Sequence, residues 1–183
     1  MTARLRRGAG YRFAPMTIEA TARGEALFRE LQWVHGMVRR DLATVEQLAQ
    51  DVADGLPAAD VRAALDELQT NGPLWQLKVN CLAYCRFVHS HHRAEDVMLF
   101  PALRARNPAV GPDIDRLEAD HRRVSDLLDG VEAAADALDA DDARARVVLT
   151  LEELHVHLLE HLDYEEREAG PTIRSLGLSQ PRR

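Results

Sequence analysis

The stretch ARARVVLTLEELHVHLLEHLDYEEREA, residues 143–169, contains the pattern that decides the fold. Its apolar residues recur every three or four positions, which places them along one face of an α-helix. The members of this apolar stripe are Val147, Leu151, Leu154, Leu158 and Leu162. A helix of about 25 residues spans about 38 Å. Its apolar face must therefore be covered by neighbouring helices.

Three more segments show the same helical spacing, over about residues 17–54, over 74–106, and from 111 to an acidic cluster at 139–142. Pro101 is predicted to bend or end the second of them. A shorter amphipathic stretch from Pro57 to Leu68 is predicted to be a connector helix. No segment alternates as a strand would. The sequence therefore predicts an all-α fold, an antiparallel up-down four-helix bundle with a short extra connector helix between its first and second long helices.

The chain has 183 residues, with 30 Asp plus Glu against 23 Lys plus Arg, and its net charge is −7. This length suits one domain, and the acidic balance disfavours nucleic acid as a partner. No apolar run is long enough to span a membrane. We expect residues 1–16 to form a basic flexible tail, residues 17–170 the bundle, and residues 171–183 a C-terminal tail.

The chain contains two cysteines, Cys81 and Cys85, four residues apart within a helical segment. This spacing predicts small buried apolar residues and no disulfide framework. The expected location is therefore cytoplasmic. Trp33 and Tyr84 are predicted to be packing residues.

Each long segment places one histidine within its apolar stripe, and the four are His35, His91, His121 and His161. Glu95 and Glu165 follow two of them by one helical turn, in the pattern His-x-x-x-Glu. A carboxylate ionised and unpaired in a core is strongly unfavourable. Two divalent ions between the helices would neutralise both carboxylates, and imidazole with carboxylate suits iron, manganese or zinc. Without ions, the same histidines would be buried residues of a helical interaction domain.

The residues His91-His92-Arg93-Ala94-Glu95-Asp96, followed by Leu99-Phe100-Pro101, resemble the HHE signature of hemerythrin-like cation-binding proteins. His35, the Asp120-His121 step and the segment from His161 to Glu166 fall in that family's order, so the resemblance covers about residues 20–170. It implies a non-haem di-iron centre inside a four-helix bundle. The terminal ligands would be His35, His91, His121 and His161, and the bridging carboxylates Glu95 and Glu165.

The third helix departs from the pattern of oxygen-carrying hemerythrins, which have a second histidine four residues from the first. Here Leu117 and Ser125 occupy the two positions four residues from His121. The resemblance is therefore to the four-histidine, two-glutamate subtype, such as the di-iron proteins that repair iron-sulfur clusters. It implies an iron position open to water or substrate, and it disfavours stable, reversible oxygen storage.

This resemblance implies a protein that binds or reacts with oxygen, peroxide or nitric oxide as a sensor, a scavenger or part of a stress response. One alternative is a peroxide-decomposing or oxidase-type di-iron enzyme, and another is an iron donor for iron-sulfur cluster repair. The expected partners are a small diatomic ligand or peroxide and a redox or iron-sulfur protein. Manganese or zinc could substitute for the two iron ions.

Helical register leaves one ligand open on the second segment. His92 lies three residues before Glu95 and could bind a metal with it in place of His91. His89 is predicted to be solvated or to support a ligand.

Two further residues have ligand-like spacing. His157 lies four residues before His161 and could bind the metal or orient a ligand. Glu118 and His121 have the Glu-x-x-His spacing of ferritin-like carboxylate sites, a pattern that also recurs by chance.

Overall fold

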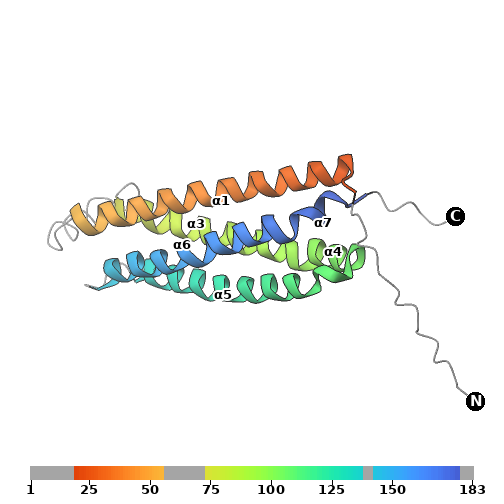
Figure 1. Cartoon of the computed structure of the whole chain (residues 1–183). Coiled ribbons are helices and arrows are strands. Elements are labelled where there is room, and N and C mark those ends of the chain that lie inside the picture. The colour runs from red at the N-terminus through yellow and green to blue at the C-terminus, as the bar shows by residue number, and fades with distance from the viewer. Residues whose placement is uncertain (1–18, 56–72, 138–141, 178–183) are drawn as a thin grey trace, which may run out of the picture.

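The computed structural model describes residues 19–55, 73–137 and 142–177. Every regular element within these ranges is a helix, so the predicted all-α bundle is confirmed. The long helices are α1 (Ala22–Gly55), α3 (Pro73–Ala94), α5 (Gly111–Asp136) and α6 (Ala143–Glu168). They lie side by side, and each runs antiparallel to the one before it (Figure 1). The connector helix predicted for Pro57 to Leu68 falls outside the described residues.

The second long helix contains an irregular turn. After α3, a π-helical turn, η1 (Glu95–Leu99), leads into α4 (Phe100–Arg106). The Phe100 amide N–H donates to the Glu95 carbonyl, five residues earlier, and Pro101 follows at the start of α4. The irregularity predicted at Pro101 therefore begins six residues before the proline, at Glu95. Such π turns are frequent at functional sites.

A short helix follows α6 and packs on the start of α1. After the 3-10 turn η2 (Pro108–Val110) and helices α5 and α6, the chain forms α7 (Gly170–Arg174), whose Ile173 is buried. The Thr21 amide donates to the Arg174 carbonyl at 2.8 Å. Gly24 permits this approach, because a Cβ atom there would lie 1.9 Å from the Arg174 carbonyl oxygen. The packed structure therefore extends beyond the boundary expected at residue 170.

A polar layer separates two apolar clusters inside the bundle. The first cluster includes Val38, Val88, Val124 and Leu158, and the second includes Phe28, Leu31, Phe100 and Leu117. His35 and His121 each lie on a helix between a residue of one cluster and a residue of the other. The layer therefore lies at one depth across neighbouring helices, as side-by-side packing of antiparallel helices allows.

Individual core predictions have mixed outcomes. Cys81 and Cys85 are buried and form no disulfide, and Tyr84 is buried, as predicted. The prediction for Trp33 is wrong, because this side chain is 63% exposed. Trp33 lies two residues from both Leu31 and His35, and a two-residue step on a helix leads away from the buried face.

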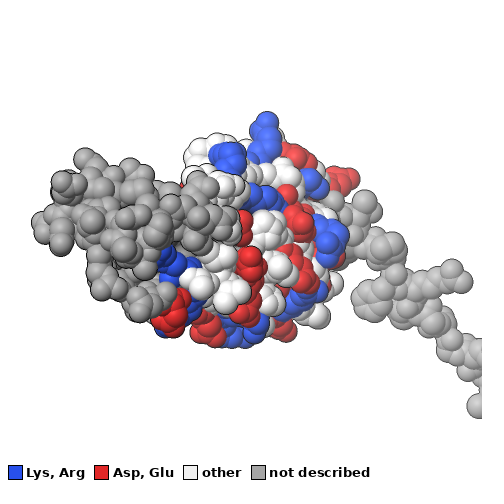
Figure 2. Space-filling view, turned by 90° about the vertical axis from the view of Figure 1, so that its left-hand side faces the viewer, with Lys and Arg blue, Asp and Glu red and all other residues white. Residues whose placement is uncertain are grey.

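The surface carries mixed charge on the face seen in Figure 2, where basic and acidic side chains are interspersed among the coloured residues. On this face the coloured residues show no continuous basic stripe of the kind that binds nucleic acid. Among the described residues, no helix has the length and apolar character needed to cross a membrane.

Candidate metal centre

Five histidines and two glutamates meet in the polar layer. They are His35 from α1, His91 and His92 from α3, Glu95 from η1, His121 from α5, and His161 and Glu165 from α6. Six of these side chains are buried, and the His91 side chain is 10% exposed. All six residues predicted as metal ligands therefore lie together, and His92 joins them.

The two carboxylate oxygens of Glu95 face different histidines. Oε1 lies 3.3 Å from His91 Nε2 and 4.0 Å from His35 Nε2. Oε2 lies 3.5 Å from His121 Nε2. Two ligand atoms at about 2.1 Å from one ion are about 3.0–3.4 Å apart. The distances from the Glu95 oxygens to His91 Nε2 and to His121 Nε2 are therefore close to the distance between two ligand atoms of one ion.

Glu165 connects the same two sides of the layer. Its Oε2 atom lies 3.4 Å from His35 Nε2 and 4.0 Å from His161 Nε2. We name His35, His91 and Glu95 the first ligand group, and His92, Glu95, His121 and His161 the second ligand group. Within each group, one potential ligand atom per residue lies within 4.8 Å of the others.

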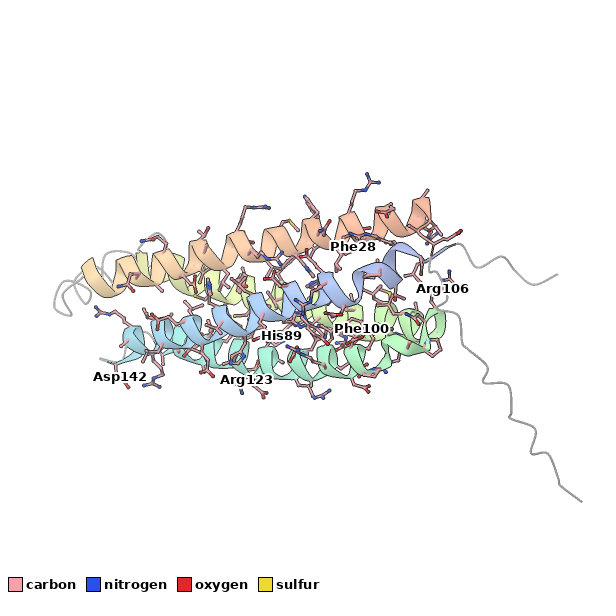
Figure 3. The ribbon with its side chains drawn as sticks, in the orientation of Figure 1. Phe28, His89, Phe100, Arg106, Arg123 and Asp142 are labelled. Atoms are coloured by element: carbon pink, nitrogen blue, oxygen red, sulfur yellow. The ribbon has the colours of Figure 1, made fainter. Side chains whose placement is uncertain are left out.

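The second ligand group contains three imidazoles. His92 stacks on His121, with ring centroids 4.1 Å apart and an interplanar angle of 11°. The Nε2 atoms of His121 and His161 are 3.1 Å apart. Phe100, labelled in Figure 3, stacks on His121 with ring centroids 5.2 Å apart. The alternatives His91 and His92 thus both lie in the layer, in different groups.

Many polar atoms of this cluster have no hydrogen-bond partner among the described residues. They are Nε2 of His35, His91 and His92, Nδ1 of His161, and both carboxylate oxygens of Glu95 and of Glu165. Buried polar atoms are nearly always paired, because an unpaired one loses its hydration without compensation. The cluster therefore fits bound cations, which would satisfy these lone pairs together.

Burial keeps most of these imidazoles neutral. It lowers the pKa of His91 to about 4, and the charge of His35 adds to the effect. Burial followed by the neighbouring histidines likewise lowers the pKa of His92 and of His121. A neutral imidazole retains the lone pair that binds a metal ion, so these three rings can act as ligands at neutral pH.

His35 and Glu95 hold protons in the metal-free centre. Burial alone would lower the pKa of His35, but the neighbouring carboxylates of Glu165, Glu166 and Glu95 outweigh it and raise this pKa to about 10. Burial, followed by the charge of Glu165, raises the pKa of Glu95 to about 8. These protons neutralise the layer where cations would otherwise do so, and metal binding would release them.

Glu166 orients His35. The His35 Nδ1–H donates to Glu166 Oε1 at 2.9 Å, which leaves Nε2 directed toward Glu165. Arg39 Nη1 and Gln32 Nε2 donate to the same carboxylate at 2.9 and 3.3 Å. The hydrogen bond from His35 is the main reason that the pKa of Glu166 falls to about 2, so this carboxylate stays ionised.

Asp96 plays the corresponding part for His121, whose Nδ1 lies 2.7 Å from Asp96 Oδ1. Carboxylates that hold the second ring nitrogen fix the tautomer and orientation of a metal-binding histidine. Asp96 and Glu166 are not among the residues predicted for the site. A signal was present, because each directly follows the glutamate of a His-x-x-x-Glu pair.

Two of the residues with ligand-like spacing lie outside both ligand groups. His157 Nε2 accepts a hydrogen bond from Arg123 at 3.2 Å on the surface. Glu118 pairs with Arg104 at 3.1 Å. His157 and Glu118 therefore each bind an arginine, and neither side chain belongs to the polar layer.

Ser125 and His89 form a separate contact beside the layer. Ser125 Oγ lies 3.4 Å from His89 Nδ1, and His89 Nε2 lies 3.5 Å from Asp129. Ser125 is the position that a second histidine of α5 would occupy in an oxygen carrier. In this chain the third imidazole of the second ligand group comes from His92 on α3 instead.

A comparison with protein families agrees with this geometry. The hemerythrin HHE cation-binding domain model matches residues 76–173, more than half of the chain. The matched residues include all members of the two ligand groups except His35, which lies on α1 before the match. No curated protein and no solved structure matches the chain. The chain is a metal-binding protein and belongs to the hemerythrin HHE cation-binding domain family.

Proposed function

We propose that this centre holds two non-haem iron ions and binds or reacts with oxygen, peroxide or nitric oxide. One ion would be held by each ligand group, with Glu95 and Glu165 bridging them. The observation that carries the proposal is the placement of Glu95, whose two oxygens face His91 on one side and His121 on the other. A single ion cannot use five imidazoles and two carboxylates and still admit a ligand.

The two ligand groups differ in their number of imidazoles. The first has His35 and His91, and the second has His92, His121 and His161. Because His92 supplies its third imidazole, the second group needs no histidine at position 125 to complete its ligands. We therefore place the open coordination position in the first group, where fewer protein ligands surround the ion.

Bound iron would supply a change of oxidation state and a coordination position for a small oxygen or nitrogen ligand. The residues of this chain hold and orient the ligands. Glu166 and Asp96 fix the rings of His35 and His121, and Phe100 covers His121 on its apolar side. This arrangement supports a sensor or scavenger of oxygen, peroxide or nitric oxide, and sustained peroxide turnover would make it an enzyme.

Burial of the ligands favours a retained centre over an iron donor for cluster repair. The most exposed ligand side chain, that of His91, is 10% exposed, and those of His35 and Glu165 are fully buried. Release of an ion from the second ligand group would require the apolar clusters on both sides of the layer to open. A donor needs ligands that partners can reach without such opening.

Metal analysis of the full chain after anaerobic loading with ferrous iron tests the proposal. We expect two iron ions per chain and an optical spectrum that changes on addition of oxygen, peroxide or nitric oxide. Glu95→Ala should reduce the content to one ion per chain or fewer, whereas Glu153→Ala, at an exposed glutamate that pairs with Arg123, should leave it unchanged. A folded chain that stays metal-free after loading would contradict the proposal.

A further inference from the structure

A groove connects the first ligand group with one end of the bundle. It runs between α1 on one side and η1 with α4 on the other, and it extends to the residues that follow α7. Its volume is about 1100 Å³. One water molecule occupies about 30 Å³ in the liquid. The groove is therefore far larger than oxygen, peroxide or nitric oxide requires.

The walls of the groove are mainly apolar. Leu27, Leu31 and Val34 of α1 form one wall, and Met98, Leu99 and Ala102 form part of the other. The Met98 side chain is 67% exposed. An exposed, flexible thioether of this kind adapts to apolar ligands of different shape.

The two ends of the groove differ in chemistry. Its inner end is lined by His91 and Glu95, which belong to the first ligand group. Its outer end is lined by Arg23 at the start of α1 and Arg106 at the end of α4. Glu30 is the other charged residue among its described lining residues. Arg106, labelled in Figure 3 at the end of the bundle, is held there by a hydrogen bond from its Nε to the Ser175 carbonyl at 3.2 Å.

The length of the apolar wall suits a chain-like molecule. Arg23 and Val34 are eleven positions apart on α1, which corresponds to about 16 Å at 1.5 Å per residue. An extended apolar chain laid along this wall would have its anionic end near the two arginines. Its other end would reach the level of His35 and His91.

We propose that this groove binds a medium- or long-chain monocarboxylate of the fatty-acid class, with its carboxylate at Arg23 and Arg106 and its apolar chain extending to the first ligand group. The placement of the chain end beside a metal ion rests on the proposed metal centre. The placement of the apolar chain and of the carboxylate does not, because it depends only on the apolar wall and the two arginines. The polarity is set by charge, because Arg23 and Arg106 both line the outer end of the groove and would pair with an ionised carboxylate there. The ligands of this protein would thus include an amphiphile as well as a small gas or peroxide.

Displacement of a fluorescent polyene fatty acid by dodecanoate from the iron-loaded full chain tests the proposal. Met98→Glu and Val97→Glu form a matched pair, because both side chains are 67% exposed and adjacent but only Met98 lines the groove. Met98→Glu should weaken dodecanoate binding about tenfold, or about 1.4 kcal/mol. Val97→Glu adds the same charge outside the groove, so it should weaken dodecanoate binding less than about threefold. Equal effects of the two substitutions would overturn the proposal.

Two further measurements test the polarity and the reach of the bound chain. Dodecyltrimethylammonium, with the opposite head charge, should bind at least about tenfold more weakly than dodecanoate, and equal binding would indicate a nonspecific apolar surface and overturn the proposal. Dodecanoate should also shift the optical spectrum of the iron-loaded protein, and an unchanged spectrum with saturated binding would overturn the placement of the chain end. Iron content is measured in the same samples, so that failure of the metal centre and failure of the groove assignment can be told apart. A protein that binds dodecanoate but no iron would refute the metal centre alone. A protein that binds iron but no dodecanoate would refute the groove assignment alone.

Discussion

Replacing Glu95 by glutamine should stabilise the metal-free protein and destabilise the iron-loaded protein. In the metal-free state the Glu95 side chain is 5% exposed, and both of its oxygens lack hydrogen-bond partners. Burial and the nearby Glu165 therefore raise its pKa to about 8. Glutamine has nearly the same shape and needs no proton to become neutral. In the loaded protein the same substitution removes an anionic bridging ligand.

The size of the effect follows from proton linkage. The folded metal-free protein keeps a proton on Glu95, whereas the unfolded chain loses it above a pKa near 4.5. This contribution to stability is complete below pH 4.5 and is lost as the pH rises through the folded pKa, at about 1.4 kcal/mol per pH unit. The glutamine variant has no such loss. Between pH 5 and pH 7 its free energy of unfolding should therefore gain about 2 to 3 kcal/mol relative to the parent protein.

Urea unfolding of chelator-treated protein at several pH values between 5 and 7 measures this gain. The lowered pKa values of the neighbouring histidines also affect stability in this range, but they act in both proteins and cancel in the difference. Glu153→Gln, at an exposed glutamate bound to Arg123, is the control and should change stability by less than about 0.5 kcal/mol at each pH. A Glu95→Gln difference that does not vary with pH would refute the reasoning, as would a variant that melts higher than the parent when both carry iron.

Three other outcomes follow from the centre. Glu166→Ala should weaken iron binding about 10- to 100-fold in a chelator competition, because His35 loses the carboxylate that orients it, whereas Glu160→Ala, at an exposed partner of Arg116, should not. His92→Ala should change the optical spectrum of the loaded protein and His157→Ala should not; identical spectra for the two variants would exclude His92 as a ligand. The reduced protein should oxidise within a few exposures to oxygen and react with peroxide, and many cycles of complete, reversible oxygenation would instead identify an oxygen carrier.

The sequence alone determined the helices and the depth of the polar layer. Helical periodicity is a local property, so the apolar stripes of α1, α5 and α6 could be read directly, and each histidine could be assigned to the buried face of its own helix. The same reasoning shows why His35 and Val38 share a face. It also places Trp33 off the buried face, because Trp33 lies two positions from both Leu31 and His35, and its expected packing role rested on its aromatic character alone.

Only the tertiary structure decided how the ligands are grouped. Neighbours across helices depend on the rotation and axial shift of each helix, and periodicity within one helix contains neither. His91 and His92 differ by one position, and the layer is wide enough to receive both, in different ligand groups. The turn at Glu95–Leu99 likewise brings Asp96 to His121 on another helix. The groove from Arg106 to His91 exists for the same reason, because its walls come from helices that are distant in the chain and meet only when the bundle packs.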